Sequence, residues 1–207
     1  MPTYGDMINR ISTQLRRSNL TDDISDAIQK AVQVYSTRRF WFNDSKDLTF
    51  TTSSSLETYT PAGLSDYGGF DFMEIARSTT DRWEVKPLDY QSFQEKRMGG
   101  DTFGDPLWYS LFNRTIYLWP IPGSALNVVV SGRKGLTTLS STADSNAWTN
   151  EGEVLIRTRA TVDLYRYVIK DFQKADVLEK EEQKELSRLR ATTNRLLGSG
   201  RLKVRYF

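Results

Sequence analysis

Few residues in this sequence have the types and spacing that acid–base catalysis needs. Two pairs of carboxylates, Glu151 with Glu153 and Asp66 with Asp71, are close enough in sequence to suggest the acid and base of a glycosidase-like site. Acids are also common in the first turn of a helix, where the helix dipole stabilises them, and in solvated loops. We therefore interpret both pairs as structural acids.

No other motif points to catalysis or to a bound cofactor. The sequence contains no cysteine and no histidine, which excludes thiolate nucleophiles, Cys/His zinc sites and Ser-His-Asp triads. The acids Asp22, Asp23 and Asp26 lack the spacing of a calcium-binding loop. The glycines in residues 97–100 match neither a phosphate-binding loop nor a dinucleotide fingerprint. The sequence predicts a protein that is not an enzyme and that has no cofactor and no metal.

The sharpest chemical signal is the basic carboxyl-terminal end. No acid follows Glu185, and the basic residues after it are Arg188, Arg190, Arg195, Arg201, Lys203 and Arg205. Neutralisation of DNA phosphates is one use of such charge. The last residues also alternate charged with apolar side chains, which favours docking as an added strand on a partner. Packing of this tail on its own domain is a third alternative.

Composition and charge place the chain among soluble proteins with large interfaces. Of its 207 residues 38% are apolar, a low value, whereas 12% are aromatic, a high one, and the net charge is only +2. Surplus aromatic side chains suit protein interfaces. The first residues have no apolar signal region, and no apolar run approaches the roughly 20 residues that span a bilayer. We expect a protein that is made in the cytoplasm and has no membrane partner.

The amino-terminal part has the periodicity of amphipathic helices. Residues 3–17 and residues 21–38 each place apolar side chains at helical spacing, and the short link between them predicts an antiparallel helical hairpin. The second helix runs into Phe40, Trp41 and Phe42. We interpret this aromatic cluster as a core plug where the helices give way to β structure.

The carboxyl-terminal part is also predicted to be helical. A core helix is expected from Glu151, with its apolar face formed by Val154 or Leu155, Thr158, Val162, Tyr165, Val168 or Ile169, and Phe172. A second and more polar helix is expected over residues 175–197. Glycines flank Ser199, and they separate this helix from the basic tail.

The middle of the chain alternates as strands do. A first hairpin is expected from residues 47–52 and 56–60, followed by a loop over residues 61–72. Helical turns are expected over residues 89–96, and further strands over residues 73–78, 82–88, 106–110, 115–119 and 127–133. Pro120 and Pro122 have no backbone N–H to donate to a neighbouring strand, so the segment between the last two strands should not pair with another strand.

Together these patterns predict an α+β fold. It consists of a helical bundle, built from the N-terminal hairpin and two long C-terminal helices, with an inserted antiparallel β domain and an extended C-terminal tail. The expected divisions are residues 1–46 for the first helical part, 47–150 for the β insert, 151–197 for the C-terminal helices and 198–207 for the tail.

The order of these elements resembles the head-to-tail adaptor, or tail accessory factor, family of short-tailed bacteriophages. The most specific pieces are Tyr117-Leu118-Trp119-Pro120-x-Pro122 with the valine strand that follows, and Asn146-Ala147-Trp148 before the helix at Glu151. The resemblance covers nearly the whole chain.

The resemblance implies a structural protein of the virion neck. Such adaptors form a twelve-subunit ring below the portal protein, extend the DNA channel without sequence-specific binding, and provide a platform for tail nozzle or tail fibre proteins. Portal docking would then use Arg201, Leu202, Lys203, Val204, Arg205, Tyr206 and Phe207. Trp108, Tyr117 and Trp119 are candidates for a subunit or tail interface. The alternative is a nucleic-acid-binding module that uses the basic C-terminal helix and tail.

Overall fold

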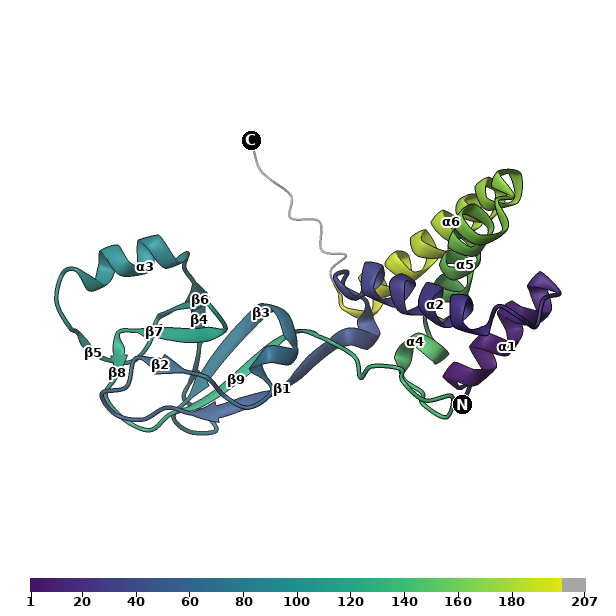
Figure 1. The fold of residues 1–207 in the computed structure, drawn as a ribbon. Helices are drawn as coiled ribbons and strands as arrows, with labels where there is room; N and C mark the ends of the chain where they lie inside the picture. The colour runs from purple at the N-terminus through teal and green to yellow at the C-terminus, as the bar shows by residue number, and fades with distance from the viewer. Residues whose placement is uncertain (199–207) are drawn as a thin grey trace. The chain divides into compact units, whose positions relative to one another are not determined.

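The structure of the protein is a computed structural model, and it describes residues 1–198 (Figure 1). The chain forms two compact units. The helical unit contains Met1–Asn43 and the described chain from Leu136 onward, and the β unit contains Asp44–Gly135. The predicted mixed α+β class is confirmed.

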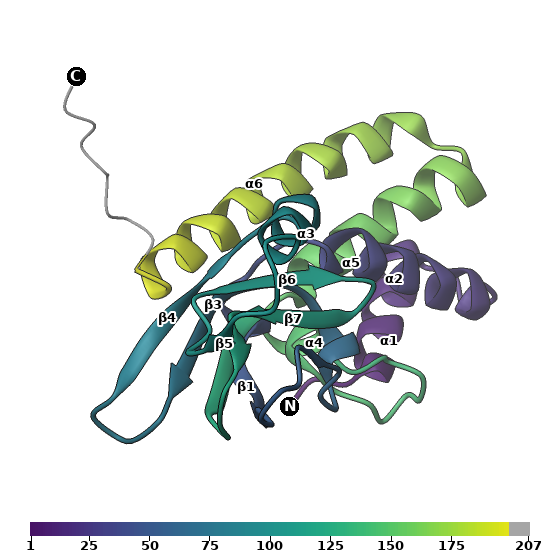
Figure 2. The ribbon, with the colours of Figure 1, turned by 90° about the vertical axis from the view of Figure 1, so that its left-hand side faces the viewer.

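The helical unit is built from amphipathic helices around one core. Its elements are α1 (Tyr4–Leu15), α2 (Thr21–Ser36), the 3-10 turn η1 (Trp41–Asn43), α4 (Ala147–Asn150), α5 (Glu153–Asp163), the π-helical turn η3 (Leu164–Ile169) and α6 (Phe172–Leu196). In α1 the Thr3 hydroxyl accepts from the Asp6 N–H, and the Asp6 carboxylate accepts from the Thr3 N–H, so a capping box fixes the start. α5 and α6 run side by side in opposite directions (Figure 2).

The aromatic cluster after α2 does pack in the helical core. The rings of Phe40 and Phe42 stack with centroids 5.2 Å apart, and Trp148 meets both edge-on at 5.6 and 5.0 Å. Trp148 lies on α4, where the Asn146 side chain accepts from its N–H and begins the helix. Residues 136–150 pack on the helices, because Tyr4 and Gly5 donate their N–H groups to the carbonyls of Asp144 and Thr142.

The helix predicted from Glu151 to Phe172 is wrong at its end. α5 ends at Asp163, the chain continues as a π-helical turn, and Lys170 takes a left-handed conformation with φ 63°. The Asp171 carboxylate then accepts from the Lys174 N–H and starts α6. Phe172 therefore belongs to α6, and it is exposed rather than buried.

The β unit is a curled seven-stranded sheet with the strand order β1-β9-β3-β4-β6-β7-β2. The strands are β1 (Asp44–Thr51), β2 (Thr58–Tyr59), β3 (Tyr67–Ala76), β4 (Arg82–Pro87), β6 (Trp108–Phe112), β7 (Thr115–Trp119) and β9 (Asn127–Lys134). A separate pair contains β5 (Phe103–Gly104) and β8 (Ile121–Pro122), and the remaining elements are the 3-10 turn η2 (Leu64–Asp66) and α3 (Tyr90–Arg97). The β3–β4 and β6–β7 hairpins and the helix α3 confirm the local predictions.

The first predicted hairpin is wrong. β1 pairs antiparallel with β9, and β2 pairs antiparallel with β7, so the two segments do not pair with each other. Alternation shows that a segment is a strand but does not name its partner. Here Leu48 is buried with Val128 and Val130 in one core, and these long-range contacts decide the pairing. The loop expected over residues 61–72 also contains η2 and the first half of β3.

The proline segment pairs, and the sheet is not purely antiparallel. β8 pairs with β5 in parallel, using the N–H of Ile121 to the Thr102 carbonyl and the N–H of Gly123 to the Gly104 carbonyl. Neither donor is a proline, which is why two prolines are compatible with this ladder. β4 and β6 are also parallel.

A polar network at the bulge of β1 should make the β unit sensitive to acid. The Asp47 carboxylate accepts from Lys134 Nζ at 2.6 Å, from Ser45 Oγ at 2.5 Å and from the Tyr67 hydroxyl. These bonds, the Lys134 bond above all, hold the pKa of Asp47 well below its ordinary value of 3.8. The folded state therefore gains stability above about pH 4, and this gain is lost as the pH falls.

Asp47→Asn should flatten that acid dependence. The difference in unfolding free energy between pH 7 and pH 3 should shrink by less than about 1 kcal/mol, because the network is largely solvent-exposed. Urea unfolding at both pH values measures it, with the exposed acid Asp101→Asn as the matched control. Equal acid dependence in Asp47→Asn and the unsubstituted protein would contradict the prediction.

Candidate interaction surfaces

The carboxylates considered for catalysis take structural positions. Glu153 is buried in the first turn of α5 and pairs with Arg10 of α1 at 3.2 Å and with Arg157 at 3.1 Å, so it ties two helices together. Glu151 lies outside α5, at the carboxyl-terminal cap of α4. Asp66 ends η2 and Asp71 lies on β3. Over residues 1–198 no group of three or more acids is arranged to hold a metal ion.

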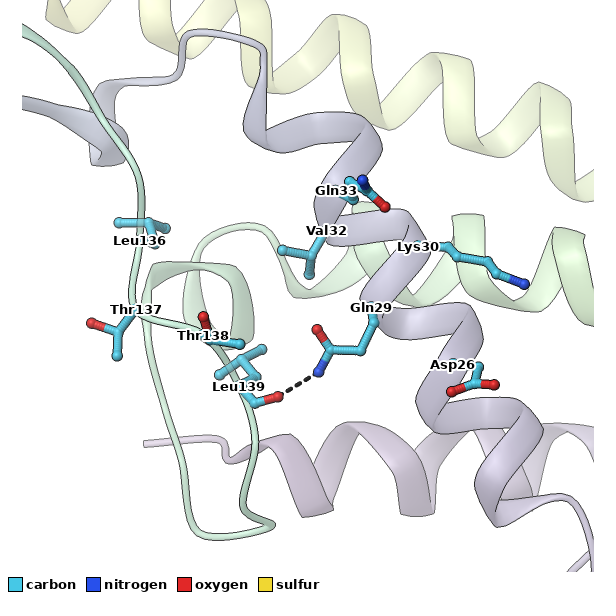
Figure 3. Close-up of a pocket in the computed structure, with 9 residues that line it drawn as sticks. All are labelled: Asp26, Gln29, Lys30, Val32, Gln33, Leu136, Thr137, Thr138 and Leu139. Atoms are coloured by element: carbon cyan, nitrogen blue, oxygen red, sulfur yellow. Dashed lines mark hydrogen bonds between the residues drawn. The ribbon is translucent and has the colours of Figure 1, made fainter. Parts of the chain in front are cut away.

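A hollow of about 480 Å³ lies between α2 and residues 136–139 (Figure 3). The Gln29 amide reaches from α2 across this hollow and donates to the Leu139 carbonyl. Asp26 and Lys30, one turn apart on α2, are the charged side chains of its lining. One acid and one base on the same exposed stripe suit surface contacts better than proton transfer in a closed site.

Buried polar side chains anchor α6 to the rest of the helical unit. The Tyr35 hydroxyl of α2 donates to Glu182 of α6, and both residues are almost fully buried. Arg159 of α5 lies between Glu182 at 3.7 Å and Asp163 at 3.1 Å. Burial raises the pKa of the Tyr35 hydroxyl above its ordinary value, and so does its bond to Glu182. Within the described part of the chain the second oxygen of Glu182 is buried without a hydrogen bond.

The three aromatic residues expected at an interface lie together on β6 and β7. Trp108 and Trp119 are register partners across the hairpin, and Tyr117 packs against Phe93 of α3 with ring centroids 5.7 Å apart. Trp119 is only 6% exposed, and Lys96 Nζ lies 4.3 Å from the centroid of the Trp108 ring. These side chains form the support of α3 on the sheet, and the most exposed aromatic of the hairpin is another residue.

That residue is Phe112, at the tip of the β6–β7 hairpin. Its ring stacks on Tyr90 at 4.0 Å, while 48% of Phe112 and 41% of Leu111 stay exposed. The turn residues Asn113 and Arg114 both have left-handed backbone, with φ 46° and 57°. Two adjacent exposed apolar side chains beside a tight turn form a candidate contact surface. The sequence places Leu111 and Phe112 beside the turn, but the pattern alone gives no sign that they face solvent.

A second group of exposed apolar residues surrounds the connection between α5 and α6. Its members are Tyr167, Val168, Phe172 and Val177, with 40 to 69% of each exposed. Periodicity missed this surface, because it assigned Val168 and Phe172 to a buried helical face. The signal that could have located the break is Asp171 three residues before Lys174, the spacing of a helix cap.

The residues predicted to dock on a portal, Arg201 to Phe207, lie outside the described residues. The preceding helix α6 is described, and it is polar as predicted. Its buried positions are limited to Ala175, Glu182, Leu186, Leu189 and Thr193, and Leu196 near its end is 56% exposed.

Comparisons with known proteins assign the chain to a protein family. Among the helices of residues 1–198 none combines the length and the apolar character needed to cross a membrane. No curated protein matches the sequence. The family model described as SU10 adaptor protein matches residues 2–205, which is almost the entire chain. A family of adaptors is structural, which favours a non-enzymatic role in a phage particle. The chain belongs to the SU10 adaptor protein family of bacteriophages.

Proposed function

We propose that this adaptor joins head to tail in the virion of a short-tailed phage. Twelve copies form a ring below the portal protein, the ring extends the channel through which DNA passes, and its other side carries the tail nozzle or fibre proteins. The observation that carries this proposal is the family match over residues 2–205, which includes both compact units and most of the basic tail.

The two compact units support a division of labour. In this proposal the helical unit, including residues 151–197, forms the ring and faces the portal, whereas the β insert spaces neighbouring subunits and meets tail components. Each unit has its own buried core and its own group of exposed apolar side chains. An exposed apolar group on each unit is what a protein with partners on two sides requires.

The β6–β7 hairpin is the proposed contact of the β unit. Trp108, Tyr117 and Trp119 hold α3 against the sheet, and Tyr90 of α3 in turn backs the exposed Phe112 ring. A rigid aromatic support under an exposed ring lowers the entropy lost when a partner binds.

Portal docking is assigned to α6 and to the tail at Arg201–Phe207. α6 has 25 residues and is about 37 Å long at the usual rise per residue. Most of its surface is exposed, so a partner can bind along it without unfolding the helical core. The tail sequence offers backbone and alternating side chains for strand addition.

Deletion of residues 199–207 should leave a folded protein that no longer joins a portal ring. Circular dichroism checks the fold, and co-sedimentation with the portal ring of the same phage measures docking, for which we expect a loss of at least about tenfold, equivalent to 1.4 kcal/mol. Normal docking of the truncated protein would contradict the assignment.

Two matched variants of the full chain separate docking from nucleic-acid binding. Tyr206→Ala with Phe207→Ala removes apolar area and keeps the charge, whereas Arg201→Ala, Lys203→Ala and Arg205→Ala do the opposite. Strand docking predicts the larger loss of portal binding for the apolar variant. If only the charge variant changes, and it lowers a steeply salt-dependent affinity for duplex DNA, the nucleic-acid alternative holds instead.

A further inference from the structure

The helical unit has two different exposed surfaces, one beside arginines that make no ion pair within residues 1–198 and one that is acidic. The first, which we name the groove, is formed by two adjoining hollows of about 560 and 340 Å³ that share Gln14 and Leu178. The second, the acidic face, surrounds a hollow of about 140 Å³ between α2 and the α5–α6 connection. Of these two surfaces, α1 contributes only to the groove and α2 only to the acidic face.

The groove has an apolar floor and is lined in part by α1, whose carboxyl-terminal end is basic. Tyr165, Val177 and Leu178 line its smaller hollow, and Val177 is 58% exposed. The charged residues of the two linings are Arg10, Arg157, Lys174 and Glu181. Arg10 and Arg157 share Glu153 and Lys174 pairs with Asp171, so these bases are already matched by acids of the same copy. Arg16 and Arg17 follow the same helix α1, are exposed, and make no ion pair within residues 1–198.

The acidic face has the opposite character. The charged residues of its lining are Asp23, Asp26, Asp163 and Lys30, and Asp163 is already paired with Arg159. Asp22 adds a further exposed carboxylate in the first turn of α2, and in the described part of the chain neither it nor Asp23 makes an ion pair. Beside these acids stand Tyr167, 69% exposed, and Val168, 40% exposed.

We propose that the acidic face of one copy binds the groove of the next copy, with Tyr167 inserted between Val177 and Tyr165. This inference rests on the proposed ring-forming function and names the contact that builds the ring. Because the two surfaces are different, the contact is heterologous, and a pair of copies still has one free groove and one free acidic face for further neighbours. Repetition of such a contact closes a ring where the rotation allows, whereas a self-complementary patch would stop at a dimer.

Charged and apolar side chains contribute differently to this interface. Carboxylates facing Arg16 or Arg17 align the two copies and disfavour groove-to-groove or acid-to-acid pairing. Burial of the Tyr167 ring and of the Val168 and Val177 side chains supplies the attraction, since aromatic residues dominate interface energetics. Free copies that meet singly gain little from one such small contact, so a ring forms best where a template gathers them.

The absence of cysteine makes a cross-linking test direct. Tyr167→Cys and Val177→Cys are placed in one chain, and each is also made alone. A short bis-maleimide is added to the protein alone at high concentration and to the protein on its portal ring. The double variant should give a ladder of trimers and larger species, an equal mixture of the two single variants should stop at dimers, and each single variant alone should stay monomeric.

A ladder that is absent under both conditions, or dimers from a single variant alone, would overturn the inference. Co-sedimentation of the double variant with the portal is measured first, so that a failure of docking is seen separately from a failure of the contact. Docking without a ladder leaves the adaptor function standing and removes this interface.

Charge reversal supplies a second readout. Asp23→Lys with Asp26→Lys in the cysteine double variant should abolish the species above monomer while the circular dichroism spectrum stays unchanged. Glu84→Lys with Asp101→Lys makes the same net change on exposed residues of the β unit, and the ladder should persist. A ladder of equal yield in both would show that the acidic face is not the contact.

Discussion

Glu182→Ala should lower the free energy of unfolding of the helical unit by about 3 kcal/mol, because it breaks a buried charged network. The substitution leaves the buried Tyr35 hydroxyl without its acceptor and takes from Arg159 one of its two carboxylates. It also removes four buried side-chain atoms from the contact between α6 and α2. Urea unfolding followed by circular dichroism measures the change.

The neighbouring acid provides the control. Glu181 lies beside Glu182 on α6 but is exposed, so Glu181→Ala should change stability by no more than about 0.5 kcal/mol. Tyr35→Phe should cost about 2 kcal/mol, since it removes a hydrogen bond to a charged acceptor. The double variant should cost clearly less than the sum of the two, because both remove the same bond. Strictly additive losses would show that Tyr35 and Glu182 do not interact.

Alkaline pH gives an independent check of the same bond. The raised pKa of Tyr35 means that the folded state holds the hydroxyl proton more tightly than the unfolded state does. This part of the stability is complete at neutral pH and is lost as the pH rises above about 10, the ordinary tyrosine pKa. In Tyr35→Phe the alkaline loss should be smaller than in the unsubstituted protein.

The parts of the fold that the sequence predicts are those set by local chemistry. Apolar spacing locates α1 and α2, and short turns locate the β3–β4 and β6–β7 hairpins, since these pairs are neighbours in the chain. The pairing of β1 with β9 joins Leu48 to Val130, far apart in sequence, and no local signal names such a partner. The α5–α6 break was missed because a helical period continues through the π turn, although Asp171 is a recognisable cap.

The candidate surfaces were predictable only in part. The sequence draws attention to Trp108, Tyr117 and Trp119, which are aromatic and close together, but aromatic residues also build cores, and Trp119 is buried. What distinguishes an interface is exposure, which depends on tertiary packing. Phe112 is partly exposed because Tyr90 covers only one side of its ring. Tyr167 lies on the π turn and is also exposed. The tail at Arg201–Phe207 remains a prediction from its sequence.

Close backbone packing in the β unit gives the second large effect, from Gly132 of β9. A Cβ at this position would lie 2.2 Å from the Gly69 carbonyl oxygen and 3.0 Å from the Phe70 Cα. Both atoms belong to the backbone of β3, so no side chain can turn away to make room. The register of β3 and β9 shifts nearby, between Phe70 and Phe72, and the glycine allows the two strands to approach at this irregularity.

Gly132→Ala should therefore force β3 and β9 apart and cost about 3 kcal/mol, the upper end for overpacking a well-packed site. Gly69→Ala is the matched control on the opposite strand, because an added Cβ there meets nothing within 4 Å, and it should be nearly neutral. Trp83, Trp108 and Trp119 lie in the β unit and Trp41 and Trp148 in the helical unit, so fluorescence has a component from each unit, whereas helical circular dichroism reports mainly on the helical unit. Because each unit has its own core, Gly132→Ala should shift the part of the fluorescence change that does not follow circular dichroism and leave the helical transition in place, and Glu182→Ala should do the reverse. Coincident shifts of both transitions in either variant would mean that the two units unfold as one, and the β insert would then have to be treated as part of the ring-forming body.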